Sequence, residues 1–229
     1  MDLTEYKICK APDCAYYIPN FITEEEEKQL LGNIYSSPKP KWKELSHRRL
    51  QNWGGLPHPK GMVAEDIPLW LQEQMDKISS LNVFGKHKPN HVLVNEYLPG
   101  QGIMPHEDGP LFYPTITTVN VGSHSMLEFY RPVKPDDEKD DSSQSLSDRH
   151  IGSLLLEPRS LLILQEDMYT SYLHGISQVA EDVLSGDIFN IELCSSNIGD
   201  VLVRDTRISL TIRHVPKVVK ANMIFGRRR

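Results

Sequence analysis

Cysteine is scarce in this sequence, and the three that occur, Cys9, Cys14 and Cys194, form no Cys-x-x-Cys pair. An odd number of widely separated cysteines argues against a disulfide framework. With 229 residues the chain is long enough to bury a core without such cross-links. We therefore expect a protein of a reducing compartment, the cytosol, the nucleus or both.

Long apolar runs are also missing. No run of about 18 apolar residues occurs, so the sequence predicts no transmembrane helix and no membrane partner. The chain does not open on a basic segment followed by an apolar one, the pattern typical of a secretory signal. No internal repeat is visible, and we expect a single domain over residues 1–229, most simply a monomer.

The net charge of −6 disfavours indiscriminate binding to nucleic acid. The charge is unevenly distributed, however. Basic residues and two tryptophans, Trp42 and Trp53, gather between Lys39 and Lys60, where Glu44 is the one acid. A local basic face that carries aromatic side chains is still suited to a phosphate backbone.

Two helices are predicted in the first third of the chain. Thr23 and Glu26 form a capping-box pattern that is followed by apolar residues at helical spacing, which predicts a helix over residues 24–35. The apolar residues of a second segment share one side at the same spacing, which predicts a helix over residues 67–80.

Most of the remaining sequence predicts β-strands. Segments that alternate in polarity or are rich in β-branched residues are bounded by turn residues. They cover residues 91–98, 115–122, 153–165 and 207–215, the third being two strands around a Pro158-Arg159 turn. This order favours a mainly β fold with flanking helices, a β-sandwich or jelly roll.

Two segments are predicted to be insertions between strands. Residues 134–150 are acidic and rich in serine, a composition that favours a flexible segment. Residues 177–203 contain several apolar residues, and we expect this second insertion to be partly ordered.

The segment GIMPHEDGP, residues 102–110, places His106 two positions before Asp108. In an extended chain both side chains point to the same face and can reach one ion. Taken alone, the pair is most simply a polar surface turn, and His174 in SYLHGI is most simply a core or edge histidine. Together the three would form a two-histidine, one-carboxylate metal site with open positions.

The segment RISLTIR alternates strictly between polar and apolar residues. In a strand, Arg207, Ser209, Thr211 and Arg213 share one face. Inside a barrel the two arginines would need anions, because a buried unpaired charge is costly, and a dicarboxylate reaching from a metal to an arginine would supply them. The alternative interpretation is a solvated edge strand.

The polar residues Asn95 and Tyr97 share a face of the segment HVLVNEYL. With them, the order Asn-x-Tyr, His-x-Asp, distal His and Arg-x-Ser-x-Thr-x-Arg resembles the AlkB family of Fe(II)/2-oxoglutarate-dependent dioxygenases. The segments LQNWGGLPHP, NHVLVNEYLPGQGIMPHEDGPLFYPT and LHGI look like the AlkB homologue six group of that family. The resemblance covers most of the chain, from about Tyr16 to Met223.

The resemblance implies a double-stranded β-helix, and a dioxygenase that uses O2 and 2-oxoglutarate and releases succinate and CO2. The residues implied to hold Fe(II) are His106, Asp108 and His174. The residues implied to hold the co-substrate 2-oxoglutarate are Asn95, Tyr97, Arg207 at the distal carboxylate and Arg213 nearer the metal. No catalytic residue beyond the metal centre is implied. The long separation of His174 and Arg207 and the acidic stretch before His174 depart from the family pattern, and we interpret them as the two insertions.

The segment RRLQNWGGLPHP, residues 48–59, occupies the place where this family carries a nucleotide-recognition lid. The resemblance therefore makes Arg49, Asn52 and Trp53 candidate substrate contacts. The indole of Trp53 would stack on a base, a contact worth roughly 1–3 kcal/mol. The alternative is that Trp53 fills the core beneath a turn.

We expect oxidative demethylation of alkylated RNA or DNA as the function. Three alternatives stay open: a nucleic-acid reader or adaptor with little or no turnover, an oxygenase that acts on protein or a metabolite, and a zinc hydrolase that uses the same three ligands. A zinc hydrolase would leave the paired arginines and the Asn-x-Tyr pair without a role.

Overall fold

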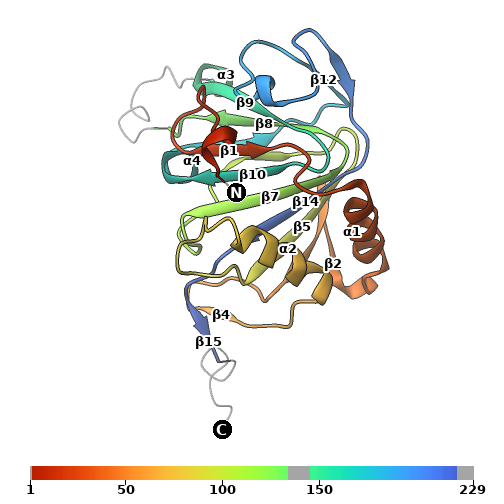
Figure 1. Cartoon of the computed structure of the whole chain (residues 1–229), viewed down its shortest axis with the longest axis vertical. Helices are drawn as coiled ribbons and strands as arrows, with labels where there is room; N and C mark the ends of the chain where they lie inside the picture. The colour runs from red at the N-terminus through yellow and green to blue at the C-terminus, as the bar shows by residue number, and fades with distance from the viewer. Residues whose placement is uncertain (1, 134–144, 221–229) are drawn as a thin grey trace.

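The computed structural model describes residues 2–133 and 145–220. Two β-sheets pack face to face, and helices cover the outer face of the larger one (Figure 1). Among the described residues, no helix has both the length and the apolar character needed to cross a membrane.

The larger sheet has seven strands. Their order across the sheet is β1 (Ala15–Ile18), β10 (Leu161–Gln165), β7 (Thr115–Gly122), β14 (Arg207–Arg213), β5 (His91–Tyr97), β3 (Arg48–Trp53) and β2 (Trp42–Leu45).

The smaller sheet has four strands. Their order is β6 (Ile103–His106), β11 (Leu173–Ile176), β8 (Ser125–Tyr130) and β9 (His150–Leu156). The two sheets together form the double-stranded β-helix, or jelly roll, expected from the sequence. Two minor pairs, β12 (Glu181–Val183) with β13 (Val201–Val203) and β4 (Met62–Val63) with β15 (Val218–Val219), lie outside this frame.

The two predicted helices are present as α1 (Glu24–Ser36) and α2 (Leu69–Ser79). The capping box of α1 is confirmed: the hydroxyl of Thr23 accepts from the backbone N–H of Glu26 at 3.2 Å, and the Glu26 carboxylate accepts from the N–H of Thr23 at 2.7 Å. Shorter helices are α3 (Leu146–Arg149), α4 (Glu166–Thr170) and the 3-10 turns η1 (Thr4–Tyr6), η2 (Lys39–Lys41) and η4 (Ile191–Leu193).

Strand β14 lies in the middle of the larger sheet, between β7 and β5, so the alternative of a solvated edge strand is wrong. All seven of its residues are buried. The apolar residues Ile208, Leu210 and Ile212 pack in the core beneath α1 and α2, whereas the polar residues face the space between the sheets. The strict alternation of the sequence therefore separates a structural face from a polar interior face.

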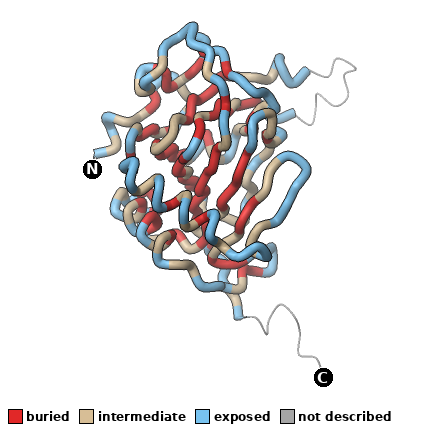
Figure 2. Tube along the Cα trace, turned by 90° about the vertical axis from the view of Figure 1, so that its right-hand side faces the viewer, coloured by how far each residue is buried: buried red, intermediate tan, exposed pale blue. Residues whose placement is uncertain are grey.

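Buried residues are concentrated in the central strands, with exposed residues at the turns and around the periphery (Figure 2). One core joins the larger sheet to α1 and α2, and a second core lies between the sheets. Phe129 and Leu154 of the smaller sheet meet Leu162 and Leu164 of the larger one in that second core. This packing fixes the distance between the sheets and hence the width of the space that holds the polar residues.

The two predicted insertions differ in how much of them the structure describes. Residues 134–144 lie outside the described residues. The rest of the first segment is α3 and the beginning of β9. The second segment, 177–203, carries the β12–β13 pair and a small core of its own, in which Ile188 and Leu184 pack against Leu155.

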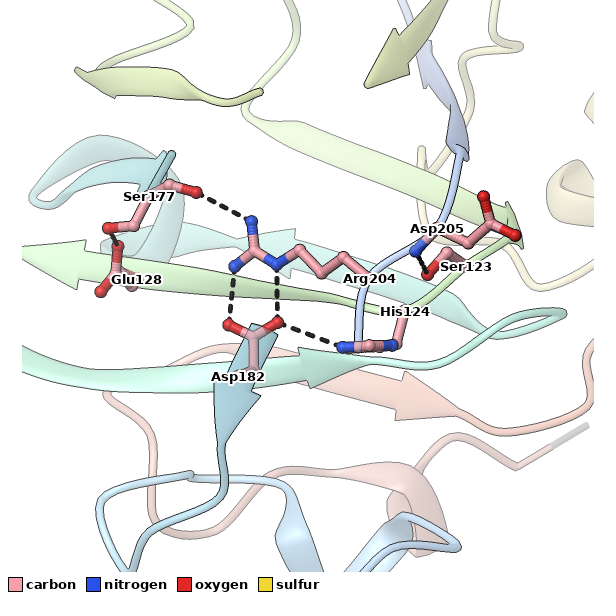
Figure 3. A network of polar contacts seen from close by, with 7 residues as sticks. All are labelled: Ser123, His124, Glu128, Ser177, Asp182, Arg204 and Asp205. Atoms are coloured by element: carbon pink, nitrogen blue, oxygen red, sulfur yellow. Dashed lines mark hydrogen bonds and ion pairs between the residues drawn. The ribbon is translucent and has the colours of Figure 1, made fainter. Parts of the chain in front are cut away.

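A polar network fastens the second segment to the sheets (Figure 3). Arg204 donates two hydrogen bonds to the carboxylate of Asp182, at 2.6 and 2.7 Å, and one to the carbonyl of Ser177 at 2.8 Å. The ring of His124, beside β8, lies 3.1 Å from the same carboxylate. Both ends of the segment are therefore held where β14 begins.

Candidate functional site

His106 and His174 face each other across the pairing of β6 with β11. Their ring centroids are 4.6 Å apart. Asp108 follows β6 by two residues, and its Oδ2 lies 3.8 Å from Nε2 of His174. The three possible ligand atoms all lie within 4.8 Å of one another, and the described residues contain no other such group of three. The structure thus brings together the three residues that the sequence marks as a metal site.

The surroundings of the two imidazoles leave a ring nitrogen of each available to a metal. Nδ1 of His106 lies 2.8 Å from the carbonyl oxygen of Met104, which can only accept, so Nδ1 carries the proton and Nε2 offers its lone pair. Burial lowers the pKa of His174 to about 4, which keeps that ring neutral at physiological pH. Oδ2 of Asp108 is buried and has no hydrogen-bond partner among the described residues. A carboxylate oxygen without a hydrogen-bond partner beside two imidazole rings fits a divalent cation.

Arg213, at the end of β14, orients the carboxylate of this group. Its Nη2 donates to Oδ1 of Asp108 at 2.6 Å, and its guanidinium lies 4.4 Å from the ring centroid of Phe112. Oδ1 is thereby occupied, and Oδ2 is left for a metal. Nε of Arg213 is buried and has no partner among the described residues, so the guanidinium retains donor capacity.

Arg207 lies at the opposite end of β14, opposite Tyr97 in the register with β5. Its Nη2 donates to Oδ1 of Asn120 at 2.6 Å, and its Nε is buried without a partner among the described residues. Burial lowers the pKa of Arg207 to about 10, which still leaves it cationic near neutral pH. Asn120 was missed in the sequence. The signal available was an amide within the β-branched segment TITTVNVG.

A cavity of about 260 Å³ contains the whole set. Its polar lining includes the candidate metal ligands and the four residues predicted for 2-oxoglutarate: His106, Asp108, His174, Asn95, Tyr97, Arg207 and Arg213. Oδ1 of Asn95 is a further buried atom without a partner among the described residues. Burial raises the pKa of Tyr97, so its phenol keeps its proton and can donate. Two guanidiniums, an amide and a phenol around one small cavity fit a dianion.

The three predicted lid residues all belong to strand β3 rather than to a loop over the cavity. Arg49 makes a two-fold ion pair with Glu96, at 2.5 and 2.9 Å, and its guanidinium stacks 4.2 Å from Trp42. Trp53 meets Trp70 of α2 edge-on at 5.9 Å between ring centroids. Both side chains therefore lie on the helix-covered face of the sheet.

Asn52 is the lid residue on the cavity face, opposite the cavity-lining Leu93, but it does not itself line the cavity. The packing of Trp53 against the core of the larger sheet favours the alternative that it is a structural residue. The structure places a different side chain of the same strand, Arg48, at the cavity. Substrate contact by Arg49, Asn52 and Trp53 stays a prediction.

Comparison with known proteins agrees with this geometry. Residues 36–213 match the profile of the 2OG-Fe(II) oxygenase superfamily. The chain is 57% identical, over 228 residues, to a Danio rerio protein named "Probable RNA/DNA demethylase ALKBH6", with 100% of this chain and 97% of the relative covered.

More distant similarities point the same way. A Xenopus tropicalis protein named "tRNA (carboxymethyluridine(34)-5-O)-methyltransferase alkbh8" is 27% identical over 86% of this chain, which spans 31% of that protein. The solved structure of OsALKBH1 shares the fold, with a TM-score of 0.56 at 14% identity over 87% of this chain and 97% of that one. This chain therefore belongs to the 2OG-Fe(II) oxygenase superfamily and, within it, to the AlkB family of Fe(II)- and 2-oxoglutarate-dependent dioxygenases.

Proposed function

We propose that this dioxygenase removes methyl groups from alkylated bases of RNA or DNA. The observation that carries the proposal is the single cavity in which three metal-ligand side chains meet two buried arginines. The family supplies the reaction class, and the name of the Danio rerio relative supplies the substrate class. The basic, aromatic-bearing stretch from Lys39 to Trp53 is consistent with a nucleic-acid substrate.

The iron would be held by Nε2 of His106, Oδ2 of Asp108 and an imidazole nitrogen of His174. The fit rests on the unpartnered Oδ2 and on the proton that the Met104 carbonyl keeps on Nδ1 of His106. Bound Fe(II), with 2-oxoglutarate and O2, supplies the oxidant that places an oxygen atom in a C–H bond. Arg213 would keep the Asp108 carboxylate turned toward that ion, as residues behind a metal ligand commonly do.

2-Oxoglutarate would lie along the polar face of β14, whose two arginines are six residues apart. Arg207, steadied by Asn120, would bind the distal carboxylate through its free N–H groups. The amide of Asn95 and the protonated phenol of Tyr97 would donate further hydrogen bonds. Arg213 would contact the end of the co-substrate nearer the metal.

The chain contributes orientation and a dry environment, and the overall reaction balances without a further protein group. An N-methyl group, O2 and 2-oxoglutarate give an N-hydroxymethyl group, succinate and CO2. The hydroxymethyl group then loses formaldehyde and leaves an N–H. Apolar side chains such as Ile116, Leu127, Leu164 and Ile176 line the cavity and exclude bulk water from the reacting carbon. A methylated base has to be unpaired or flipped out of a duplex to enter.

The direct test is succinate formation with Fe(II), 2-oxoglutarate and O2 in the presence of methylated single- and double-stranded RNA and DNA oligomers. Mass spectrometry of each oligomer shows whether a methyl group is lost. Loss of a methyl mass with stimulated succinate formation supports the demethylase. Succinate with unchanged oligomers moves the substrate to a protein or metabolite, and binding without succinate favours a reader.

The compartment and assembly state are proposed from the sequence as well. We propose a cytosolic or nuclear protein, because the three cysteines are free. A monomer is proposed as the simplest assembly. Cell fractionation and sedimentation of the purified chain test the two statements separately.

A further inference from the structure

A groove outside the cavity runs between the free edges of the two sheets. β2 is the last strand of the larger sheet, and β6 is the last strand of the smaller one. The groove lies between the turn that joins β2 to β3 and the β6 residues Met104 and Pro105. Arg48 and His106 line both the groove and the cavity, so the groove leads directly to the proposed metal site.

The chemistry of this groove is unlike that of the chain as a whole. The protein has a net charge of −6, yet no aspartate or glutamate lines the groove. Its polar side chains, Ser46, His47, Arg48, His106 and Gln178, all carry hydrogen-bond donors. Met104, a residue that is 78% exposed, provides an apolar rim to the groove. Donors without acids beside an apolar surface suit an anionic group that is attached to an apolar or aromatic body.

Arg48 is the charged residue of the groove and is unlike its neighbour Arg49. Arg49 is neutralised by Glu96 on the helix-covered face. Arg48 is half-buried and points to the cavity face. Its Nε is buried and has no hydrogen-bond partner among the described residues. A buried N–H group without an acceptor is costly in the free protein, and a ligand oxygen would remove that cost.

We propose that Arg48 binds a backbone phosphate of the nucleic-acid substrate, next to the nucleotide whose base enters the cavity. The proposal rests on the proposed function and specifies the contact that recognises its substrate class. A guanidinium matches two phosphate oxygens in a two-fold hydrogen-bonded pair. Met104 and Leu45 contact the sugar or the neighbouring base, and His47 donates a further hydrogen bond from the turn.

The first experiment measures binding of a methylated single-stranded oligonucleotide by fluorescence anisotropy at several salt concentrations. The protein is loaded with Fe(II) and 2-oxoglutarate without oxygen. Arg48→Ala is expected to weaken binding roughly tenfold at low salt. The slope of log affinity against log salt should become shallower by about 0.7, the value for one phosphate contact on a single strand. Arg48→Lys should restore most of the slope and part of the affinity.

Lys28→Ala is the matched control, since it removes one exposed positive charge from α1, on the other side of the larger sheet. Its binding curve should match that of the unsubstituted protein. An equal loss in Lys28→Ala and Arg48→Ala would mean that net charge alone governs binding, and the proposal would fall.

The second experiment finds the phosphate. Single phosphates on either side of the methylated base are replaced, one at a time, by uncharged methylphosphonates. At the correct position the replacement weakens binding to the unsubstituted protein but not to Arg48→Ala, because the contact is already lost. A replacement several nucleotides away should weaken both proteins equally. Additive losses at every position would overturn the assignment of Arg48 to a phosphate.

The outcomes separate this proposal from the proposed function. The phosphate contact alone is overturned if the unsubstituted protein demethylates an oligomer and Arg48→Ala binds that oligomer with the same affinity and the same salt dependence. No methyl loss from any oligomer, with succinate formation stimulated by an acidic peptide, overturns both. A raised KM for 2-oxoglutarate in Arg48→Ala, with unchanged oligonucleotide affinity, would place Arg48 on the co-substrate instead.

Discussion

Arg213 donates from Nη2 to Oδ1 of Asp108 at 2.6 Å, while the other oxygen of that carboxylate lies 3.8 Å from Nε2 of His174. One strand thus ends in a residue that controls the proposed metal ligand, although 105 positions separate the two in the sequence. The same strand begins with Arg207, the residue proposed for the far end of the co-substrate. β14 therefore carries, at its two ends, the residue beside the proposed metal ligand and the residue proposed for the co-substrate.

Arg213→Met should loosen the Asp108 carboxylate and lower iron affinity by about 10- to 100-fold. The measurement is anaerobic iron titration against a chelator, in the absence of 2-oxoglutarate. Arg207→Met is the matched comparison, because it removes the same group from the far end of the strand. It should raise the KM for 2-oxoglutarate and change iron affinity little. An equal loss of iron affinity in both variants would show that Arg213 does not specifically orient the Asp108 carboxylate.

Asn120→Ala should raise the KM for 2-oxoglutarate by removing the acceptor that steadies Arg207. We also expect the free energy of unfolding to fall by about 1–3 kcal/mol, because a buried guanidinium is left without a partner. Steady-state kinetics and urea unfolding check the two effects. Asn52→Ala serves as the control, because it removes an amide from the same face of the sheet that makes no hydrogen bond to Arg207. An unchanged KM in Asn120→Ala would rule out a positioning role.

Stability should fall in acid partly because of His91, a buried neighbour of Arg213. Burial, followed by the positive charge of Arg213, lowers the pKa of His91 to about 3. The unfolded chain binds a proton here near its ordinary pKa of about 6.5, whereas the folded chain does not, so stability is lost as the pH falls from about 6.5 toward 3. The loss should be up to roughly 1 kcal/mol per pH unit from this group.

The check on His91 is urea unfolding of the metal-free protein across this pH range. His91→Phe should show a shallower pH dependence than the unsubstituted protein. His47→Gln, on an exposed turn, should keep the original dependence. If His91→Phe and the unsubstituted protein lose stability in parallel, another group controls the acid limb.

Arg49 should prove to be a structural residue. Its ion pair with Glu96, whose side chain is 5% exposed, is partly screened because Arg49 itself is 32% exposed. Arg49→Ala should therefore lower the free energy of unfolding by about 1–3 kcal/mol. The double variant Arg49→Ala, Glu96→Leu should regain part of that loss, since no acid is left unpaired. If Arg49→Ala is fully folded but binds the oligonucleotide more weakly, the result would instead support substrate contact by Arg49.

Short-range patterns in the sequence were sufficient to predict the fold and to select residues that the structure brings together. The alternation in RISLTIR fixed which residues of β14 face the interior, and the capping box located the start of α1. The ordered set of Asn, Tyr, His, Asp and Arg positions pointed to the family as a combination, although no single piece of it is specific alone. The structure places all seven of those residues around one cavity.

What the sequence did not reveal depends on pairing between distant segments. The sequence RRLQNW does not show which of two adjacent arginines faces the interior, because the register between β3 and β5 decides it. The contact between Asn120 and Arg207 joins strands 87 positions apart, and no local signal announces it. The structure adds the face of the sheet on which each side chain lies and the distant residue that it contacts.

The measurement that tests the account most directly uses an oligonucleotide whose N-methyl group is labelled with ¹³C, incubated with the Fe(II)-loaded protein, 2-oxoglutarate and O2. We predict ¹³C-formaldehyde and succinate in equal amounts, an oligonucleotide lighter by one methyl group, and none of these products with His106→Ala. Succinate formed while the label stays on every oligonucleotide tested would contradict a nucleic-acid demethylase. Succinate formed by His106→Ala at the unsubstituted rate would contradict the metal site itself.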